Sequence, residues 1–305
     1  MSTYHIPVML KECLEGLDIK PNGIYVDVTF GGGGHTRAIL EKLDGGMLYA
    51  FDQDADAKAN AEEFQQHRSF TFVESNFRFL KRQLRFHGVK QVDGILADLG
   101  VSSHQLDEGS RGFSTRFDGE LDMRMDQGAA VTAKHVVNEY EQKDLIHILS
   151  AYGEVKNAKT LAAAIIRARG MKTIHRNEQL REIALTCAPR GREMKYLAQL
   201  FQAIRIEVND EMGALHEFLE QTPEVLAPGG RLVVMSYHSL EDRPVKNFIN
   251  AGNIRGKQEK DFYGNIIRPL ESITRKPIIA GEEELERNNR ARSAKLRVAE
   301  RVQSK

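Results

Sequence analysis

Four consecutive glycines, residues 31–34, lie between a strand-like segment and a helix-like segment, and this placement constrains the fold more than any other feature. Residues 24–30 are apolar and β-prone, whereas residues 34–43 have the apolar spacing of an amphipathic helix. Glycine lets the backbone turn sharply and approach a ligand without a Cβ clash. The first N–H groups of the following helix lack partners within that helix. This order of elements indicates the floor of a nucleotide-type cofactor pocket.

Strand-like and helix-like segments alternate through the first hundred residues, which predicts a parallel sheet with helices on both faces. A short helix at 8–17 precedes them. Strands are expected at 24–30, 47–51, 70–73 and 92–99, and helices at 34–43, 55–66 and 80–86. The predicted fold class is therefore α/β, with a Rossmann-like sheet.

The alternation then stops, and the next strand-like segment is residues 231–236. One crossover helix of a dozen residues or more would suffice to connect two such strands. Helical patterns occupy much of the gap, at 141–152, 156–169, 177–187 and 194–206. The sequence therefore predicts an inserted helical domain at 107–206 between two parts of the core, 1–106 and 207–305. A helix at 209–226 leads into the fifth strand, and a last strand is expected at 294–299, with residues 266–267 as a candidate partner.

Composition and charge narrow the class of protein. No apolar run approaches the roughly 20 residues that span a bilayer, and the N-terminus has no signal pattern, which predicts a cytoplasmic protein without membrane contact. Cys13 and Cys187 are too few for a disulfide framework, and no His/Cys cluster has metal-ligand spacing, so no metal is predicted. Net charge is zero, but residues 167–205 carry nine Lys/Arg against three Glu, and residues 287–305 are also basic. Such segments either bind phosphates or form solvated surfaces.

The glycine loop does not match the dinucleotide fingerprint G-x-G-x-x-G. Gly31-x-Gly33 is followed by Thr36 and Gly32-x-Gly34 by Arg37, so neither register supplies the third glycine. This mismatch argues against an NAD site.

Side chains at the ends of successive strands favour S-adenosylmethionine (SAM) instead. Asp52 ends the second strand and suits the ribose hydroxyls of either cofactor. Asn76 and Phe77, after the third strand, offer an amide and an aromatic face for adenine. Asp98 ends the fourth strand, beside the expected position of the reactive methyl group. Alone, each residue has a bland interpretation, such as a helix cap or a core side chain; together they indicate a SAM site.

Long motifs extend this pattern from one end of the chain to the other. They are HIPVML at 5–10, DVTFGGGGHT at 27–36, DQD at 52–54, DGILADLGVSSHQLD at 93–107, RGFS at 111–114, LDMRMD at 121–126, FQAIRI at 201–206, SYHSLEDR at 236–243 and NRARSAKLR at 289–297. In these motifs the chain resembles the bacterial 16S ribosomal RNA (cytosine-N4)-methyltransferase family, the MraW family.

The resemblance implies a SAM-dependent methyltransferase that acts on the exocyclic N4 of a cytidine in the decoding region of 16S rRNA, within the small ribosomal subunit. It implies SAM contacts at Gly33, Gly34, His35, Asp52, Phe77, Asp98 and Gln105. The family often has Arg or Ala at the second loop glycine, so Gly32 is expected only to loosen the loop.

Asp98 and His238 are the predicted catalytic residues. Cytosine N4 is a poor nucleophile because its lone pair is delocalised, so the protein must align N4 with the methyl group and accept a hydrogen bond from it. Asp98 is expected to orient the amine. His238 follows the fifth strand. It either contacts the flipped base or relays its proton, and the alternative is a hydrogen-bonded loop histidine.

Ser102, Ser103, Tyr237, Arg290 and Arg292 are the predicted substrate contacts. The two serines lack a His/Asp relay and are not expected to act as nucleophiles. For Tyr237 the alternative is a core position, and for the arginines it is ordinary surface charge. The Asp-rich loop at 121–126 is expected to form local ion pairs rather than a cation site.

Three other functions stay open on the residues alone. The same chemistry could act on DNA amines or protein side chains, an NAD-dependent oxidoreductase could use the loop, or an RNA-binding scaffold could retain it without activity. The sequence carries no dimer-specific signature, so both a monomer and a homodimer stay open.

Overall fold

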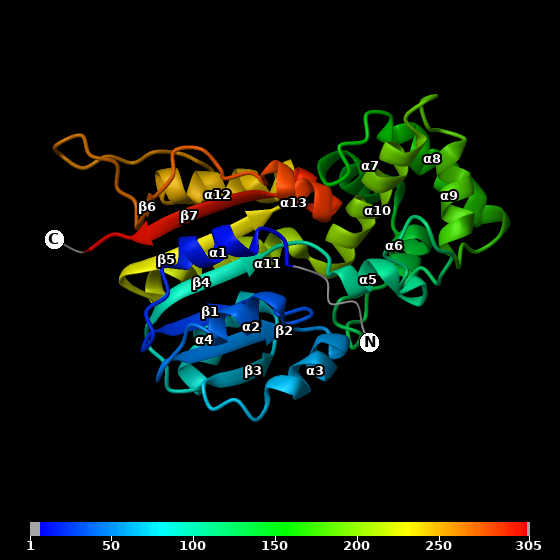
Figure 1. Cartoon of the computed structure of the whole chain (residues 1–305). Coiled ribbons are helices and arrows are strands. Elements are labelled where there is room, and N and C mark those ends of the chain that lie inside the picture. Colours follow the sequence, from blue (N-terminus) through cyan, green and yellow to red (C-terminus); the bar gives the residue numbers. More distant parts are fainter. Residues whose placement is uncertain (1–6, 304–305) are drawn as a thin grey trace. The chain divides into compact units, whose positions relative to one another are not determined.

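The computed structural model describes residues 7–303, so His5 and Ile6 of the first motif lie outside the described residues. The chain divides into two compact units (Figure 1). The first contains the chain up to Gly100 and from Met212 onward, and the second is Val101–Glu211. No helix within residues 7–303 is both long enough and apolar enough to cross a membrane.

A seven-stranded sheet forms the centre of the first unit, in the order β3-β2-β1-β4-β5-β7-β6. Its strands are β1 (Ile24–Asp27), β2 (Met47–Asp52), β3 (Phe70–Glu74), β4 (Val92–Asp98), β5 (Leu226–Ser236), β6 (Leu270–Ser272) and β7 (Lys295–Arg301). Strands β1 to β5 are parallel, and β7 is antiparallel to both β5 and β6. The strand order reverses between β1 and β4, where the carboxyl ends of a doubly wound sheet open a ligand crevice. The predicted α/β, Rossmann-like fold class is confirmed.

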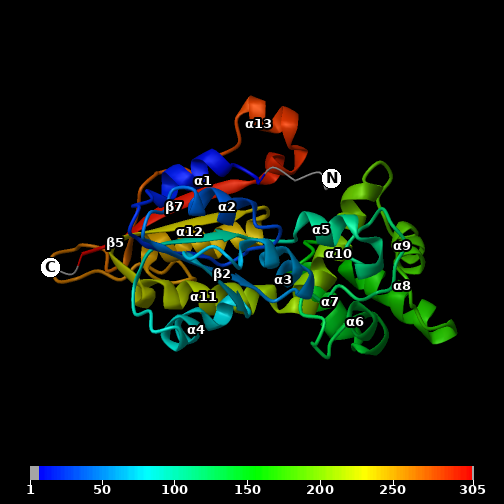
Figure 2. The same ribbon diagram turned by 60° about the horizontal axis from the view of Figure 1, so that its bottom comes forward.

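Helices cover both faces of this sheet because successive strand residues point to opposite sides. One face packs against α1 (Leu10–Leu17), α2 (Gly34–Leu40) and α3 (Ala55–Ala61), and the other against α4 (Leu80–Phe86), α11 (Glu211–Val225) and α12 (Ser239–Ala251). Figure 2 shows α1 and α2 on one side and α4 and α11 on the other. Neighbouring residues divide accordingly: Tyr25 and Leu96 join the first core cluster, and Val26 and Ile95 the second. Each such buried side chain contributes about 1.5–3 kcal/mol.

The second unit is helical and has a core of its own. Its helices are α5 (Ser103–Asp107), α6 (Ala133–Glu139), α7 (Gln142–Ala151), α8 (Ala158–Met171), α9 (Asn177–Leu185) and α10 (Glu193–Asn209). Leu145, Leu161, Leu180 and Leu200 are fully or almost fully buried in one cluster. The unit extends beyond residues 107–206 at both ends, because it includes α5 and the last turn of α10.

Several elements differ in extent from the sequence-based expectation. The first strand ends at Asp27, because its side chain accepts the Thr29 N–H and turns the chain into the loop. The partner of β7 is not residues 266–267 but β6, and residues 251–293 contain a further helix, α13 (Glu282–Arg287). Ile266 instead bridges to Lys260 within a local hairpin. Short-range pattern alone does not distinguish these two pairings.

Candidate active site

The glycine loop joins β1 to α2 at the carboxyl edge of the sheet. Gly33 has φ 74, in the left-handed region that favours glycine, and a Cβ there would lie 2.8 Å from Phe64 Cε2. A Cβ on Gly34 would overlap Pro7 Cγ, whereas a Cβ on Gly32 would meet nothing within 4 Å. Sterics therefore require glycine at 33 and 34, and the neighbouring position 32 faces open space.

Asp27 secures the loop from below. Its carboxylate accepts the Thr29 N–H at 3.1 Å and the Thr36 hydroxyl at 2.9 Å, and Thr29 Oγ1 accepts the Asp98 N–H at 2.7 Å. These bonds connect β1, the loop, α2 and the end of β4. Burial raises the pKa of Asp27 to about 6. The sequence analysis did not single out Asp27, although an acid in an apolar strand directly before a glycine loop was a usable signal.

Asp52 occupies the end of β2, next to the loop. Its Oδ2 accepts the Gly31 N–H at 2.8 Å and its Oδ1 accepts the Asp54 N–H at 2.9 Å. Burial raises the pKa of this carboxyl to about 6, although both hydrogen bonds oppose the shift. Each carboxylate oxygen has a further acceptor position, so Asp52 can still accept hydroxyl groups such as those of a ribose.

Phe77 follows β3 and is half-buried, with its ring centroid 5.5 Å from that of Phe218 in an edge-to-face arrangement. The preceding Asn76 uses its side chain within the fold. Its Oδ1 accepts the Arg78 N–H at 2.9 Å, and its amide donates to Gln53 Oε1 at 2.8 Å. The Phe77 ring is therefore held in place by Phe218, while Asn76 mainly caps the short helix that follows it.

Asp98 at the end of β4 is held by a side chain from far along the chain. Tyr237 Oη donates to Asp98 Oδ1 at 2.8 Å, and His35 Nδ1 lies 4.0 Å from Asp98 Oδ2. Burial raises the pKa of Asp98 to about 7, against the opposing effect of the Tyr237 hydrogen bond. Burial and the neighbouring Asp98 also raise the pKa of Tyr237 well above its usual value.

His35, in the loop, is a neutral side chain with a defined tautomer. Burial lowers its pKa to about 4. Its Nε2 lies 3.2 Å from the Val8 carbonyl oxygen, which can only accept, so we assign the proton to Nε2. Nδ1, which faces Asp98, then carries the lone pair.

Glu241, in the first turn of α12, is only 2% exposed and organises the segment after β5. Its Oε2 accepts the Tyr237 N–H at 2.8 Å. Its Oε1 lies 3.1 Å from His238 Nε2, but neither buried ring nitrogen of His238 is aligned for a hydrogen bond with any residue between 7 and 303. The sequence analysis missed Glu241, because a glutamate near the start of a helix is ordinarily an exposed residue.

The first unit therefore gathers three carboxyls at the carboxyl ends of its parallel strands, with Asp27 buried and Asp52 and Asp98 half-buried. Among the described residues, no Lys or Arg forms an ion pair with Asp27, Asp52 or Asp98. Carboxyls that lie partly out of water without a cationic partner disfavour anions and favour a positively charged ligand. SAM carries a sulfonium, an ammonium and a ribose diol, and this set of acceptors fits all three.

Three further predicted site residues belong to the second unit. Ser102 precedes α5, Ser103 is its first residue, and Gln105 is buried within it. Ser102 Oγ accepts the Gln105 N–H at 3.1 Å, and Gln105 Oε1 accepts the Ser102 N–H at 3.0 Å. This capping box is a sufficient local reason for Ser102 and Gln105.

The remaining basic residues have different environments. Arg292 is exposed and Arg290 half-buried, both in the turn Asn289–Ser293 before β7. Arg297, a further basic residue of the same motif, donates from Nε to Asp242 at 2.6 Å and is thus used between β7 and α12. In the second unit, Arg124 binds both oxygens of Asp122, which confirms the local ion pair expected there.

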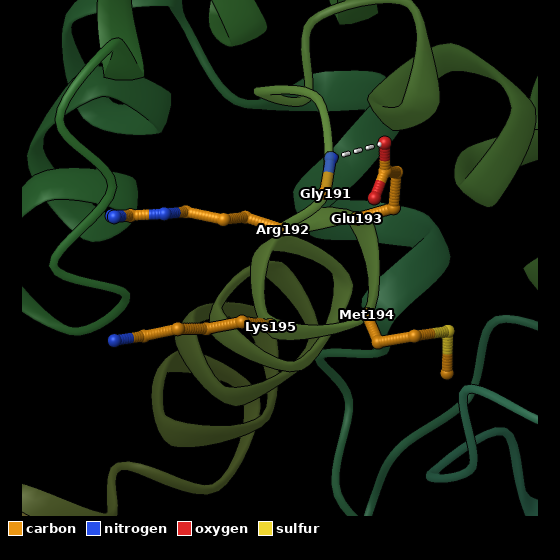
Figure 3. A pocket seen from close by; sticks show the side chains of 5 residues that line it. All are labelled: Gly191, Arg192, Glu193, Met194 and Lys195. Atoms are coloured by element: carbon orange, nitrogen blue, oxygen red, sulfur yellow. Dashed lines mark hydrogen bonds between the residues drawn. The ribbon is translucent and has the colours of Figure 1, made fainter.

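The start of α10 lines a hollow of about 430 Å³ in the second unit. Figure 3 shows Arg192 and Lys195 extending to the same side, away from Met194. Glu193 accepts the Gly191 N–H at 2.9 Å and holds the turn before the helix. Arg192 and Lys195, two cations of the basic segment 167–205, therefore lie on one side of the start of α10.

Comparison with known proteins relates the whole chain to one family. Residues 2–302 match the model of the MraW methylase family. A protein of Cytophaga hutchinsonii is 57% identical over 298 residues, which cover 98% of this chain and 99% of the relative. A protein of Flavobacterium johnsoniae is 57% identical over 300 residues, with 98% of each chain covered. Both carry the name ribosomal RNA small subunit methyltransferase H.

Solved structures resemble the chain more distantly. An rRNA methylase from Streptococcus thermophilus aligns with a TM-score of 0.41 and 14% identity, covering 96% of this chain and 94% of that one. A SAM-dependent O-methyltransferase from Thermotoga maritima aligns with a TM-score of 0.40 and 9% identity, covering 97% and 65%.

Proposed function

The chain belongs to the MraW methylase family, and on this premise we propose that it transfers a methyl group from SAM to 16S rRNA of the small ribosomal subunit. The proposed acceptor is the exocyclic N4 of a cytidine in the decoding region, and the proposed place of action is the cytoplasm. The observation that carries the proposal is the Asp98–Tyr237 hydrogen bond beside the glycine loop, since it places a fixed acceptor at the carboxyl edge of the sheet.

Residues of the first unit are proposed to form most of the cofactor site. The backbone at Gly33 and Gly34 and the neutral His35 form the floor, Asp52 accepts the ribose hydroxyls, and Phe77 supports the adenine. Gln105 is a further proposed SAM contact, on the family resemblance. When bound, SAM supplies an electrophilic methyl group on a positively charged sulfur.

Asp98 is the proposed acceptor for the target amine. Its Oδ1 already accepts the Tyr237 hydroxyl, so we assign Oδ2 to the N4–H of cytosine. An ionised acceptor at this atom shifts electron density toward N4 and aligns its lone pair. A carboxyl with a pKa of about 7 is close to the balance point for gaining and releasing a proton near neutral pH.

His238 is proposed to border the base, with Glu241 Oε1 3.1 Å from its Nε2. Tyr237 is proposed to be a wall of the pocket as well as a hydrogen-bond donor. A paired cytosine cannot reach such a crevice, so the target base must be unpaired or extruded.

The second unit is the proposed RNA clamp. The shared direction of Arg192 and Lys195 at the start of α10 supports this proposal, because two neighbouring cations can contact successive phosphates (Figure 3). Ser102, Ser103, Arg290 and Arg292 complete the proposed substrate contacts.

The test is label transfer from tritiated SAM to small ribosomal subunits purified from cells that lack this modification, followed by nucleoside analysis. We expect label in N4-methylcytidine with the wild type and little or none with Asp98→Asn. Absence of label with the wild type, despite SAM binding in calorimetry, would favour the scaffold. Label in another nucleoside would overturn the proposed acceptor, and binding of NAD but not SAM would favour an oxidoreductase.

A further inference from the structure

A short hairpin lies between α12 and β6 and includes residues 266–267, which the sequence analysis offers as a candidate strand partner. Lys260 and Ile266 form a bridge between its two arms. The Ile267 N–H donates to Glu259 O at 2.8 Å, and the Asp261 N–H donates to Asn265 O at 2.9 Å. We call residues 259–267 the aromatic hairpin.

Side chains fix both the turn and the root of the aromatic hairpin. Asp261 Oδ1 accepts the N–H groups of Tyr263 and Asn265, each at 2.9 Å, and its Oδ2 accepts the Asn265 side-chain amide at 3.0 Å. At the root, Asn253 Oδ1 accepts the Lys257 N–H at 3.1 Å, and Asn247 Nδ2 donates to Ile254 O at 3.0 Å. Hydrogen bonds therefore hold the backbone on both sides of the tip.

The tip exposes two aromatic rings. Phe262 is 97% exposed and Tyr263 is 85% exposed, and their rings lie edge to face at 5.5 Å. An aromatic side chain that is exposed to water contributes little to the free energy of folding. An exposed pair on a hydrogen-bonded turn therefore indicates an interaction site.

Positive charge surrounds this tip. Arg255, Lys257 and Lys260 are exposed, and none of them has an ion-pair partner within residues 7–303. Residues 253–268 carry four Lys/Arg against Glu259 and Asp261. The hydrogen bonds of Asp261 to Asn265 lower its pKa and keep it ionised, so four Lys/Arg less two acids leave two net positive charges on this segment. The surface beside the rings therefore attracts anions.

The aromatic hairpin lies at the amino ends of the parallel strands, and the candidate active site lies at their carboxyl ends. Glu271 and Arg231 are level with each other because both pair with Glu300. Asp98 pairs with Met235, four residues further along β5, which is roughly 13 Å along the strand direction. The hairpin precedes β6, and Figures 1 and 2 both show this segment projecting beyond the end of the sheet where β6 begins.

We propose that the aromatic hairpin binds RNA remote from the target cytidine, with Phe262 and Tyr263 stacking on unpaired bases and Arg255, Lys257 and Lys260 contacting phosphates. Stacking on aromatic side chains beside a basic surface is how proteins recognise single-stranded RNA. A stable protein partner requires a continuous interface of about 1,000 Å² or more, which a narrow tip does not provide by itself. This inference rests on the proposed function and deepens it: the preferred substrate is an extended RNA, such as that of an assembled subunit, rather than a short RNA around the target.

The test compares the double variant Phe262→Ala/Tyr263→Ala with wild type on small subunits and on a short RNA hairpin that contains only the target region. We expect the KM for subunits to rise about 30-fold or more, in keeping with the cost of losing two stacked bases, with kcat and SAM affinity unchanged. The short RNA should be methylated by both proteins with the same kinetics. Phe262→Tyr/Tyr263→Phe, which keeps both rings, should restore the wild-type KM.

Phe86→Ala is the matched control. Phe86 is 83% exposed in the same unit, and its ring lies edge to face with His87 at 5.4 Å, but it is not part of the basic hairpin. This variant should leave the KM for subunits unchanged. Equal effects of Phe86→Ala and the double variant would overturn the proposal.

A direct measurement separates this inference from the proposed function. Fluorescence polarisation with a labelled single-stranded RNA oligonucleotide should show weaker binding by the double variant than by wild type. If affinity for that RNA is unchanged, the proposal is overturned, and a raised KM for subunits would then point to a protein contact. If wild type methylates no RNA, the proposed function fails, while the polarisation comparison still decides whether the hairpin binds RNA.

Discussion

The side chains at the two ends of the central sheet's strands differ in charge and in exposure to water. At the carboxyl edge, Asp27, Asp52 and Asp98 are held by backbone N–H groups and hydroxyls and have raised pKa values. At the opposite end of the strands, the aromatic hairpin exposes Phe262 and Tyr263 to water beside exposed Lys and Arg side chains. The acidic crevice proposed among these three carboxyls suits a cationic cofactor and a neutral base, and it repels phosphates. An exposed basic tip attracts phosphates. On the two proposals above, the chemistry and the RNA anchoring lie at opposite ends of one sheet, so the acidic and the basic surface do not compete for the same part of the substrate.

The strongest way to break this comparison is to remove the charge of the crevice. Asp98→Asn should lower kcat about 10²- to 10⁴-fold, the range for losing a positioned proton acceptor, while its KM for small subunits changes little. Rapid-quench label transfer measures the effect. Activity within a few-fold of wild type would show that Asp98 is not the acceptor.

The same variant has a second expected effect, on stability without cofactor. The folded pKa of Asp98, about 7, exceeds its ordinary value of 3.8, so the stability associated with the neutral carboxyl is lost as pH rises through about 7. Asp98→Asn removes this loss and should stabilise the protein at pH 8 by about 1–3 kcal/mol, with little change at pH 4. This is below the full effect of the shift because the side chain is 23% exposed to water. Urea unfolding at both pH values provides the measurement.

Substitution of the loop glycines tests how tightly the loop at the carboxyl ends of the strands is packed. Gly34→Ala places a Cβ against Pro7 and should weaken SAM binding about 10- to 100-fold, since overpacking costs about 1–3 kcal/mol. Gly32→Ala is the matched control, because its Cβ meets nothing within 4 Å and should leave SAM affinity within about twofold. Calorimetry on both variants decides, and equal losses would contradict the described loop geometry.

The pH dependence of cofactor binding tests the acidic crevice directly. A bound sulfonium favours ionised carboxylates, so binding of SAM should release protons from Asp98 and Asp52, whose pKa values are about 7 and 6 in the free protein. SAM affinity should therefore fall up to tenfold per pH unit between about pH 7 and 6, and up to a hundredfold per unit below about pH 6, where both carboxyls must lose a proton. S-adenosylhomocysteine lacks the sulfonium charge and should show a weaker dependence. Identical pH profiles for the two ligands would count against the crevice as a cation site.

The smallest expected effect concerns Tyr237. Its hydrogen bond lowers the pKa of Asp98, so Tyr237→Phe should raise that pKa and move the acid limb of the kcat profile to higher pH. Activity should drop several-fold at pH 7 and recover largely at pH 9. A profile that is reduced equally at every pH would assign Tyr237 to packing against the base instead.

The fold could be predicted well from the sequence where local patterns determine it. The strand-like runs and the glycine loop lie within short segments, and their order alone implies a parallel sheet. The boundaries and the hairpin could not be predicted in the same way. Asp27 ends its strand through a side-chain bond to Thr29, and residues 266–267 look like a strand whether they pair with β7 or with their own hairpin.

The candidate site shows the same division. Asp52 and Asp98 were found because strand ends are visible in the sequence and meet at one edge. Glu241 was missed because its burial depends on the packing of α12, and the second unit gives Ser102 and Gln105 a capping role that the motif alone does not reveal. The roles assigned to these residues stay predictions until the variants are measured.

The sequence by itself determined the order of the strands along the chain, the place of the glycine loop and the family to which the chain belongs. Each of these depends on residues that are close together or on motifs that follow one another in order. Only the tertiary structure decided the protonation and orientation of the site. Asp98 and Tyr237 are 139 residues apart, and burial, which raises the pKa of Asp98 to about 7 and lowers that of His35 to about 4, arises from helices packed on both faces of the sheet. Desolvation depends on every neighbour of a group in space, and no segment of the chain contains that information alone.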